Sequence, residues 1–308
     1  MGTMLTLNTD SAAIDAMILT KDRAIPEFSR AKQVPLARIA VIGDGTNDLP
    51  FLIDERYALI GAPANAKSEV RERVRQMRNG HVYEEEGIDA FFRFYDDARS
   101  RGATHIVSDK DGVLKIGDDE RGDAFHERVG GRMGLDGPLV TVLTGSSLDQ
   151  NLDFMAKYHF DQRLTQNRAV RDDPYLILAE NGALHVNVLD PALTRNLAGE
   201  MDRAALGVLK GPFERAVLER AEREVLPAFG FAWSARYNDQ RGKVYAPSRH
   251  LLIAGDRPKE TMVTLNVPRR TAEGADFRKT PDAARFRDAV LQVMIDEAQR
   301  LGMPYHVL

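Results

Sequence analysis

Short apolar runs alternate with amphipathic stretches along residues 15–186. Each apolar run has the length of a buried strand and ends in glycine, threonine or charged residues. The runs that we predict to be strands are Arg38–Ile42, Tyr57–Ile60, His105–Val107, Leu139–Leu143 and Tyr175–Ala179. Because strands that alternate with helices form parallel sheets covered on both faces, this pattern predicts an α/β fold with a doubly wound, mostly parallel sheet.

The helices between these strands are predicted from apolar residues at helical spacing. The stripes are Val70, Val74 and Met77; Ile88, Phe91, Phe92 and Tyr95; and Leu148, Leu152 and Met155. Two more helices are expected, one from Thr20 or Asp22 to about Lys32 and a short one over Leu49–Asp54. The first of them would place Lys21 at its exposed beginning.

The pattern changes near residue 187. A long helical stretch over 197–226 is followed by short alternating strands near 231–236, 251–254 and 262–267. A last helix is delimited by Thr280 and Pro281 at its start and by Gly302 at its end. At the other end of the chain, residues 5–20 suggest an extended piece, a short helical piece and an apolar run. We therefore predict two domains, an α/β core over 15–186 and an α+β cap over 187–308 with 1–14.

Composition narrows the classes of function. The 308 residues are 43% hydrophobic and 29% charged, which is typical of a globular protein. With 42 basic and 46 acidic residues the net charge is -4, which disfavours a nucleic-acid partner. The absence of cysteine excludes disulfides, thiolate zinc sites and a cysteine nucleophile. No apolar run could span a bilayer and the N-terminus does not resemble a signal peptide, so we expect a cytoplasmic protein without a membrane partner. The oligomeric state is left open.

The segment Ser108-Asp109-Lys110-Asp111-Gly112 follows the apolar run His105–Val107. In an extended backbone alternate side chains point the same way, so Asp109 and Asp111 can share one small site beyond the strand. Two carboxylates this close favour a cation between them, and oxygen ligands suit a hard ion such as Mg2+.

Two further polar loops follow buried strands. Gly43-Asp44-Gly45-Thr46-Asn47-Asp48 comes after Arg38–Ile42, and Thr144-Gly145-Ser146 comes after Leu139–Leu143. Since ligands of open parallel sheets bind at the carboxyl ends of the strands, these loops and Lys21 can converge. Phosphoryl transfer needs these residue types: a nucleophile, an acid/base, carboxylates for Mg2+, and a hydroxyl with an ammonium for the phosphoryl oxygens.

Together these segments resemble the four signature motifs of the haloacid dehalogenase superfamily of phosphatases. The matching segments are Asp109-x-Asp111-Gly112-Val113, Thr144-Gly145, Lys21 and Gly43-Asp44-Gly45-Thr46-Asn47-Asp48. The turn Glu180-Asn181-Gly182-Ala183 is similar to one that is common in the sugar-phosphatase branch.

The resemblance implies a role for each matching residue. Asp109 would attack phosphorus to form an aspartyl-phosphate, and Asp111 would protonate the departing alkoxide and later activate water. Thr144 would hydrogen-bond the phosphoryl group, and Lys21 would pair with both that group and the nucleophile.

The resemblance also implies a metal site and substrate contacts. Mg2+ would be held by Asp109, the backbone carbonyl of Asp111 and Asp44, with Asp48 as a ligand or as a partner of the ligands. The substrate contacts would come from Asn47, Gly145, Ser146 and Asn181.

Two features depart from the resembling family. Lys21 and Asp44 precede Asp109, whereas in the family the nucleophile motif comes first, so the order resembles a circular permutation in which residues 302–308 would lead into residues 5–8. Ser146 stands where the sugar-phosphatase branch usually carries arginine. We expect a Mg2+-dependent phosphatase of a small phosphorylated metabolite, most simply a sugar phosphate. A phosphomutase or phosphotransferase, or a module that only binds a phosphorylated ligand, remains an alternative.

Overall fold

The structure is a computed structural model that describes residues 3–8, 13–17, 21–116, 121–158, 166–194, 203–230, 243–246, 251–254, 262–266, 277–303 and 305–307. The chain divides into two compact units, Thr20–Glu200 and a second formed by Met1–Leu19 with Met201–Leu308. The first boundary lies a few residues after the predicted one, and the second lies after the last strand of the large sheet. Each unit is described by itself.

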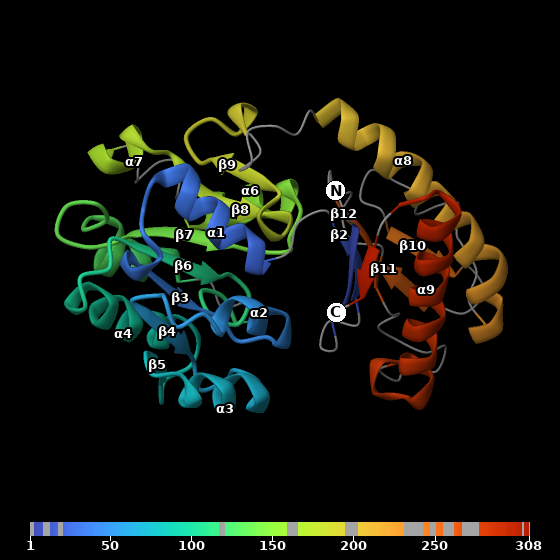
Figure 1. Cartoon of the computed structure of the whole chain (residues 1–308), viewed down its shortest axis with the longest axis horizontal. Coiled ribbons are helices and arrows are strands. Elements are labelled where there is room, and N and C mark those ends of the chain that lie inside the picture. Colours follow the sequence, from blue (N-terminus) through green and yellow to red (C-terminus); the bar gives the residue numbers. More distant parts are fainter. Residues whose placement is uncertain are drawn as a thin grey trace. The chain divides into compact units, whose positions relative to one another are not determined.

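The first unit is built on a seven-stranded sheet with the order β5-β4-β3-β6-β7-β8-β9 (Figure 1). The strands are β3 (Ile39–Ile42), β4 (Leu59–Ala62), β5 (Gly80–Val82), β6 (His105–Asp109), β7 (Leu139–Leu143), β8 (Tyr175–Ala179) and β9 (Leu184–Asn187). All neighbours are parallel except β8 and β9, which are antiparallel. The predicted α/β class with a mostly parallel sheet is confirmed.

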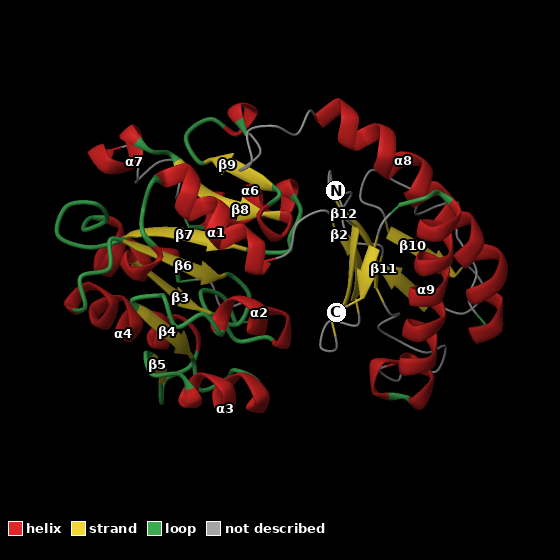
Figure 2. Ribbon diagram, viewed as in Figure 1, coloured by secondary structure: helices red, strands yellow, loops and turns green. Residues whose placement is uncertain are grey.

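The helices of this unit lie beside the sheet (Figure 2). They are α1 (Lys21–Lys32), α2 (Leu49–Leu52), α3 (Ser68–Gln76), α4 (Gly87–Ser100), α5 (Gly122–Phe125), α6 (Leu148–Lys157) and α7 (Arg168–Asp172). The apolar stripe predicted on α4 is buried, with Phe91 fully inaccessible and Tyr95 1% exposed, because the helix packs that face against the strands. Burial of these stripes holds the strand ends, and the loops that follow them, in fixed places.

Two strands of the sheet, β5 and β9, were not predicted from the sequence pattern. The segment Gly80–Val82 is short and carries polar residues, so its alternation is weak. The strand Leu184–Asn187 lies between the Glu180-Asn181-Gly182 turn and the change of pattern near residue 187, so the sequence pattern does not distinguish it. In that turn φ is +50° at Glu180, +59° at Asn181 and +96° at Gly182, so the backbone reverses and β9 returns antiparallel to β8.

The second unit contains a four-stranded sheet with the order β12-β2-β1-β13 and a two-stranded sheet of β10 and β11. Its strands are β1 (Thr3–Asn8), β2 (Ala13–Met17), β10 (Lys243–Ala246), β11 (Leu251–Ala254), β12 (Met262–Asn266) and β13 (Tyr305–Val307). The helical piece expected near the start of the chain was wrong: β2 forms there because β1 and β12 flank it as antiparallel partners. The strand expected at 231–236 lies outside the described residues.

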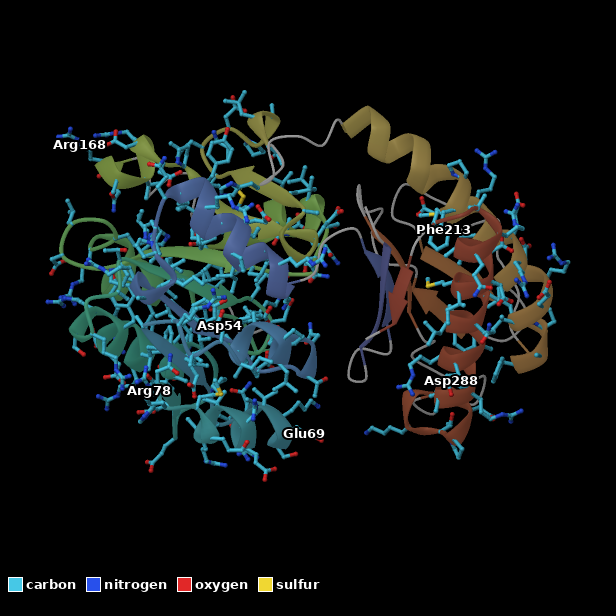
Figure 3. The ribbon with its side chains drawn as sticks, viewed as in Figure 1. Asp54, Glu69, Arg78, Arg168, Phe213 and Asp288 are labelled. Atoms are coloured by element: carbon cyan, nitrogen blue, oxygen red, sulfur yellow. The ribbon has the colours of Figure 1, made fainter. Side chains whose placement is uncertain are left out.

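Two helices pack on this sheet, α8 (Arg203–Arg220) and α9 (Pro281–Arg300). Their apolar faces share a core that includes Phe213, labelled in Figure 3, with Val217, Phe286 and Met294. Pro281 begins α9 and Gly302, with φ +65°, follows its end, as the sequence predicted. No helix among the described residues is long and apolar enough to cross a membrane.

The terminal strands β1 and β13 are neighbours in the same sheet, with Thr3 opposite Tyr305. They run parallel, so a chain that continued from β13 into β1 would have to cross back along the sheet rather than turn tightly.

Candidate functional site

The three polar loops predicted from the sequence follow neighbouring strands of the large sheet. Asp44 and Asp48 follow β3, Asp109 ends β6, and Thr144 follows β7. In the sheet β6 lies between β3 and β7, with Ser108 opposite Ile42 and Asp109 opposite Leu143. Because these strands are parallel, their carboxyl ends lie on one edge, and the loops meet there.

Lys21, the first residue of α1, joins two of the loops. Its ammonium donates to Asp48 Oδ1 and to Asp109 Oδ1, each at 2.6 Å, and all three side chains are buried. Burial by itself lowers the pKa of Lys21, but the charges of Asp109 and Asp48 outweigh it, and the pKa is raised. Lys21 is therefore a firmly protonated cation between the two carboxylates.

The second carboxylate oxygen of Asp48 holds its own loop. Asp48 Oδ2 accepts hydrogen bonds from the backbone N–H groups of Asp44 and Gly45, both at 3.0 Å. A Cβ at Gly43 would lie 2.7 Å from Asp48 Oδ2, so only glycine allows this close approach. Asp48 thus anchors the loop after β3 to Lys21.

The carboxylates of Asp44, Asp48 and Asp109 offer ligand atoms that all lie within 4.8 Å of one another. Burial, followed by the charge of Asp48, raises the pKa of Asp44 to about 7. Burial also raises the pKa of Asp109, although Lys21 opposes it. Neighbouring carboxylates repel one another when ionised, and a bound cation stabilises their ionised forms. Three oxygen donors fit a hard ion such as Mg2+.

The turn after Asp111 packs against this acidic cluster. Gly112 has φ +85°, and a Cβ there would lie 2.0 Å from Asp44 Oδ2. The side chain of Asn65 holds the turn in place, because it donates to the Gly112 carbonyl at 2.8 Å and accepts from the Gly87 N–H at 2.9 Å. Asn65 was missed in the sequence, although its position just after β4, on the same edge of the sheet, was the available signal.

The loop after β7 forms the other side of the site. Thr144 Oγ1 accepts from the Ser146 N–H at 3.1 Å and its hydroxyl lies 3.1 Å from Ser146 Oγ. The buried ammonium of Lys110 donates to Ser146 Oγ at 2.6 Å. Burial lowers the pKa of Lys110, while Asp111 and Asp109 act in the opposite direction. The sequence analysis assigned no role to Lys110, since a lysine between two aspartates is usually exposed.

The remaining predicted residues surround these two groups. Asp111 is not part of the acidic cluster: its side chain is 64% exposed and lies 3.5 Å from Lys110 Nζ. Asn47 is half-buried and folds back over Gly45, where a Cβ would lie 2.3 Å from its Oδ1. Asn181 is buried and its N–H donates to the Thr144 carbonyl at 2.8 Å, which ties the β8–β9 turn to the loop after β7.

Comparison of the chain with protein families, curated proteins and solved structures found no match. The fold and the side chains at its strand ends therefore carry the functional argument. They define an α/β protein with a buried Lys–Asp pair, a cluster of carboxylates and a pair of hydroxyls on one edge of a parallel sheet.

Proposed function

We propose that the chain is a Mg2+-dependent phosphatase of the haloacid dehalogenase type, acting on a small phosphorylated metabolite through an aspartyl-phosphate. The observation that carries the proposal is the Lys21 ammonium, 2.6 Å from both Asp48 and Asp109, with Asp44 in the same cluster. A lysine that pairs with a nucleophilic carboxylate beside a cation site is an arrangement that suits phosphoryl transfer through a covalent intermediate.

Asp109 is the nucleophile in this proposal. Lys21 holds Asp109 Oδ1, and no described residue donates a hydrogen bond to Asp109 Oδ2. One oxygen of the carboxylate is thus oriented while the other can attack. In the first step the Asp109 oxygen bonds to phosphorus, the bond from phosphorus to the leaving oxygen breaks, and Asp111 gives that oxygen a proton.

Asp111 then takes a proton from water, whose oxygen attacks phosphorus as the bond to Asp109 breaks. The exposure of Asp111 fits this role, because an acid/base must meet both a leaving group and water. Asp109, Asp44 and the Asp111 carbonyl, with Asp48, would hold Mg2+, which would offset the negative charge of the phosphoryl group. Asn47, Gly145 and Asn181 would contact or shape the substrate pocket.

The finer architecture belongs to the proposal. The sheet unit would be the doubly wound core of the family, and the α+β unit would be a cap that excludes water and selects a substrate such as a sugar phosphate. The neighbouring strands β1 and β13 support a permuted order, because they join the two ends of the chain in one sheet. Because the two strands are parallel, a chain in the unpermuted order would need a crossover connection between β13 and β1.

Hydrolysis of an aryl phosphate with and without Mg2+ tests the proposal. Asp109→Asn keeps the shape of the side chain and removes the nucleophile, so activity should fall at least a thousandfold, on the order of the loss seen when other covalent catalysts lose their nucleophile. Asp54→Asn is the matched control: Asp54, labelled in Figure 3, pairs with Arg56 on the surface of the same unit.

Equal rates for wild type and Asp109→Asn would refute the mechanism. Transfer of the phosphoryl group to an added alcohol or sugar, in place of release as phosphate, would show a phosphotransferase. Phosphate binding without turnover would indicate a binding module.

A further inference from the structure

The side chain of Lys110 points away from the acidic cluster. Its ammonium contacts Ser146 in the loop after β7 and lies 5.9 Å from the ring centroid of Phe154 on α6. The residue is 5% exposed, which is rare for lysine. Burial of its charge costs free energy unless the ammonium is paired or hydrogen-bonded. Its nearest carboxylate is that of Asp111, at 3.5 Å and largely in solvent.

The hydroxyls of Thr144 and Ser146 carry one proton each, and the hydrogen bond between them uses only one of the two. An ammonium can only donate, so Ser146 Oγ accepts from Lys110. Thr144 Oγ1 accepts from the Ser146 N–H, and a single proton serves the 3.1 Å contact between the two hydroxyls. Whichever hydroxyl donates within the pair, the other keeps a proton for an outside acceptor. No side chain in the described part of the chain accepts it.

The distribution of charge explains why this acceptor is an anion. Lys21 is already shared by two carboxylates, so among the described residues the acidic side offers no unpaired cationic side chain to a phosphoryl oxygen, and its positive charge would come from the proposed Mg2+. Lys110 supplies positive charge on the hydroxyl side. In a buried setting, the ammonium polarises the Ser146 hydroxyl and makes the remaining proton a stronger donor.

We propose that Lys110 is a positioning residue that orients and polarises the Thr144–Ser146 hydroxyl pair, so that the pair donates a hydrogen bond to a non-bridging oxygen of the phosphoryl group. The inference rests on the proposed function and deepens it. It also accounts for Ser146 at a position where the resembling branch carries arginine. Residue 146 has no positive charge of its own here, and the ammonium of Lys110, hydrogen-bonded to Ser146, supplies it.

Binding of inorganic phosphate in the presence of Mg2+, measured by isothermal titration on the full chain, tests the proposal separately from turnover. Lys110→Met keeps most of the aliphatic stem and removes the charge, and Ser146→Ala removes the relay. Each should weaken phosphate binding about tenfold to a hundredfold, the loss typical of one charge-assisted hydrogen bond. Because Lys110 acts through Ser146, the double variant should lose no more than the larger single loss.

The matched control is Lys32→Met. Lys32 is also a lysine with a largely covered side chain, 9% exposed, and is paired with an aspartate, Asp173, but it ends α1, about 16 Å along the helix from Lys21. Its replacement should leave phosphate binding unchanged. Lys110→Arg should retain most of the affinity. In the Lys110→Met background, Ser146→Arg should restore binding, because it returns a cation to the hydroxyl side.

Steady-state kinetics with an aryl phosphate give the second readout, in which Lys110→Met should raise KM more than it lowers kcat. Wild-type phosphate affinity in Lys110→Met, or additive losses in the double variant, would overturn the inference. Absence of phosphate binding by the wild type would overturn it as well. If phosphate binds and Lys110→Met weakens it, while Asp109→Asn leaves hydrolysis unchanged, the phosphatase mechanism fails and the anion contact stands.

Discussion

Replacement of Lys21 by methionine is the sharpest test of how the site is held together. The substitution keeps the length of the side chain and removes the ammonium. Asp48 and Asp109 would then face each other with side chains that are 1% and 9% exposed and with no cation between them. Loss of one partner from a buried ion pair costs about 3–5 kcal/mol, because the remaining charge is left uncompensated. We expect a loss of this size in the free energy of unfolding of the 20–200 unit at neutral pH.

The loss should shrink as the pH falls. Burial raises the pKa of Asp109, and removal of Lys21 removes the main influence that lowers it. In the variant, Asp109 therefore takes up a proton in the folded state above the pH at which it does so in the unfolded chain. Proton uptake by the folded state makes stability increase as pH decreases through that window. Adding Asp109→Asn to Lys21→Met should likewise recover part of the stability.

Urea denaturation followed by circular dichroism, with amide hydrogen exchange of β3 and β6 to assign the transition to the sheet unit, provides the measurement. Lys32→Met is the reference, because Asp173 is 30% exposed and water can solvate it once the lysine is gone. We expect it to cost about 1 kcal/mol or less. A loss in Lys21→Met no larger than that of Lys32→Met, or strictly additive losses in Lys21→Met/Asp109→Asn, would show that Lys21 does not compensate buried charge.

Three further predictions concern the same unit. Gly112→Ala should destabilise it by about 1–2 kcal/mol and weaken Mg2+ binding, because the residue has φ +85° and its Cβ would meet Asp44. An unchanged unfolding temperature and an unchanged Mg2+ affinity, both measured by calorimetry, would contradict this contact. Mg2+ should stabilise the unit by about 2.7 kcal/mol at a hundredfold excess over Kd, and a thermal shift that survives Asp44→Asn would place the ion elsewhere. Burial lowers the pKa of His105 from 6.5 to about 4, so the unfolded chain binds more protons between these values and stability should fall by up to about 3 kcal/mol as the pH drops through them. His105→Leu should flatten this dependence of the urea midpoint on pH, and an equally steep slope would assign it to other groups.

The sequence alone was sufficient for most secondary structure of the sheet unit. The strands β3, β6, β7 and β8 and the helices α3, α4 and α6 lie where apolar runs and apolar periodicity predict them, within a few residues, and α1 begins between the two predicted start residues, Thr20 and Asp22. Periodicity is a local property, set by which face of each element is buried, so it can be read from neighbouring residues. It is weak in the short segment Gly80–Val82, and after Glu180-Asn181-Gly182 only three successive positive φ values reveal that the chain turns back into β9.

The clustering of acidic loops at one sheet edge followed from the parallel topology, but the partners of each side chain did not. Lys21 meets Asp48 and Asp109, which are 27 and 88 residues away along the chain. Only tertiary structure decided that Asp48 accepts hydrogen bonds from its own loop and that Asp111 faces solvent. It also decided that Lys110 contacts Ser146 in the loop after β7. The physical reason is that residue types specify which groups can ionise or donate, whereas strand order and register determine which of them share a low-dielectric site, and hence which charges are paired and which protons are left for a ligand.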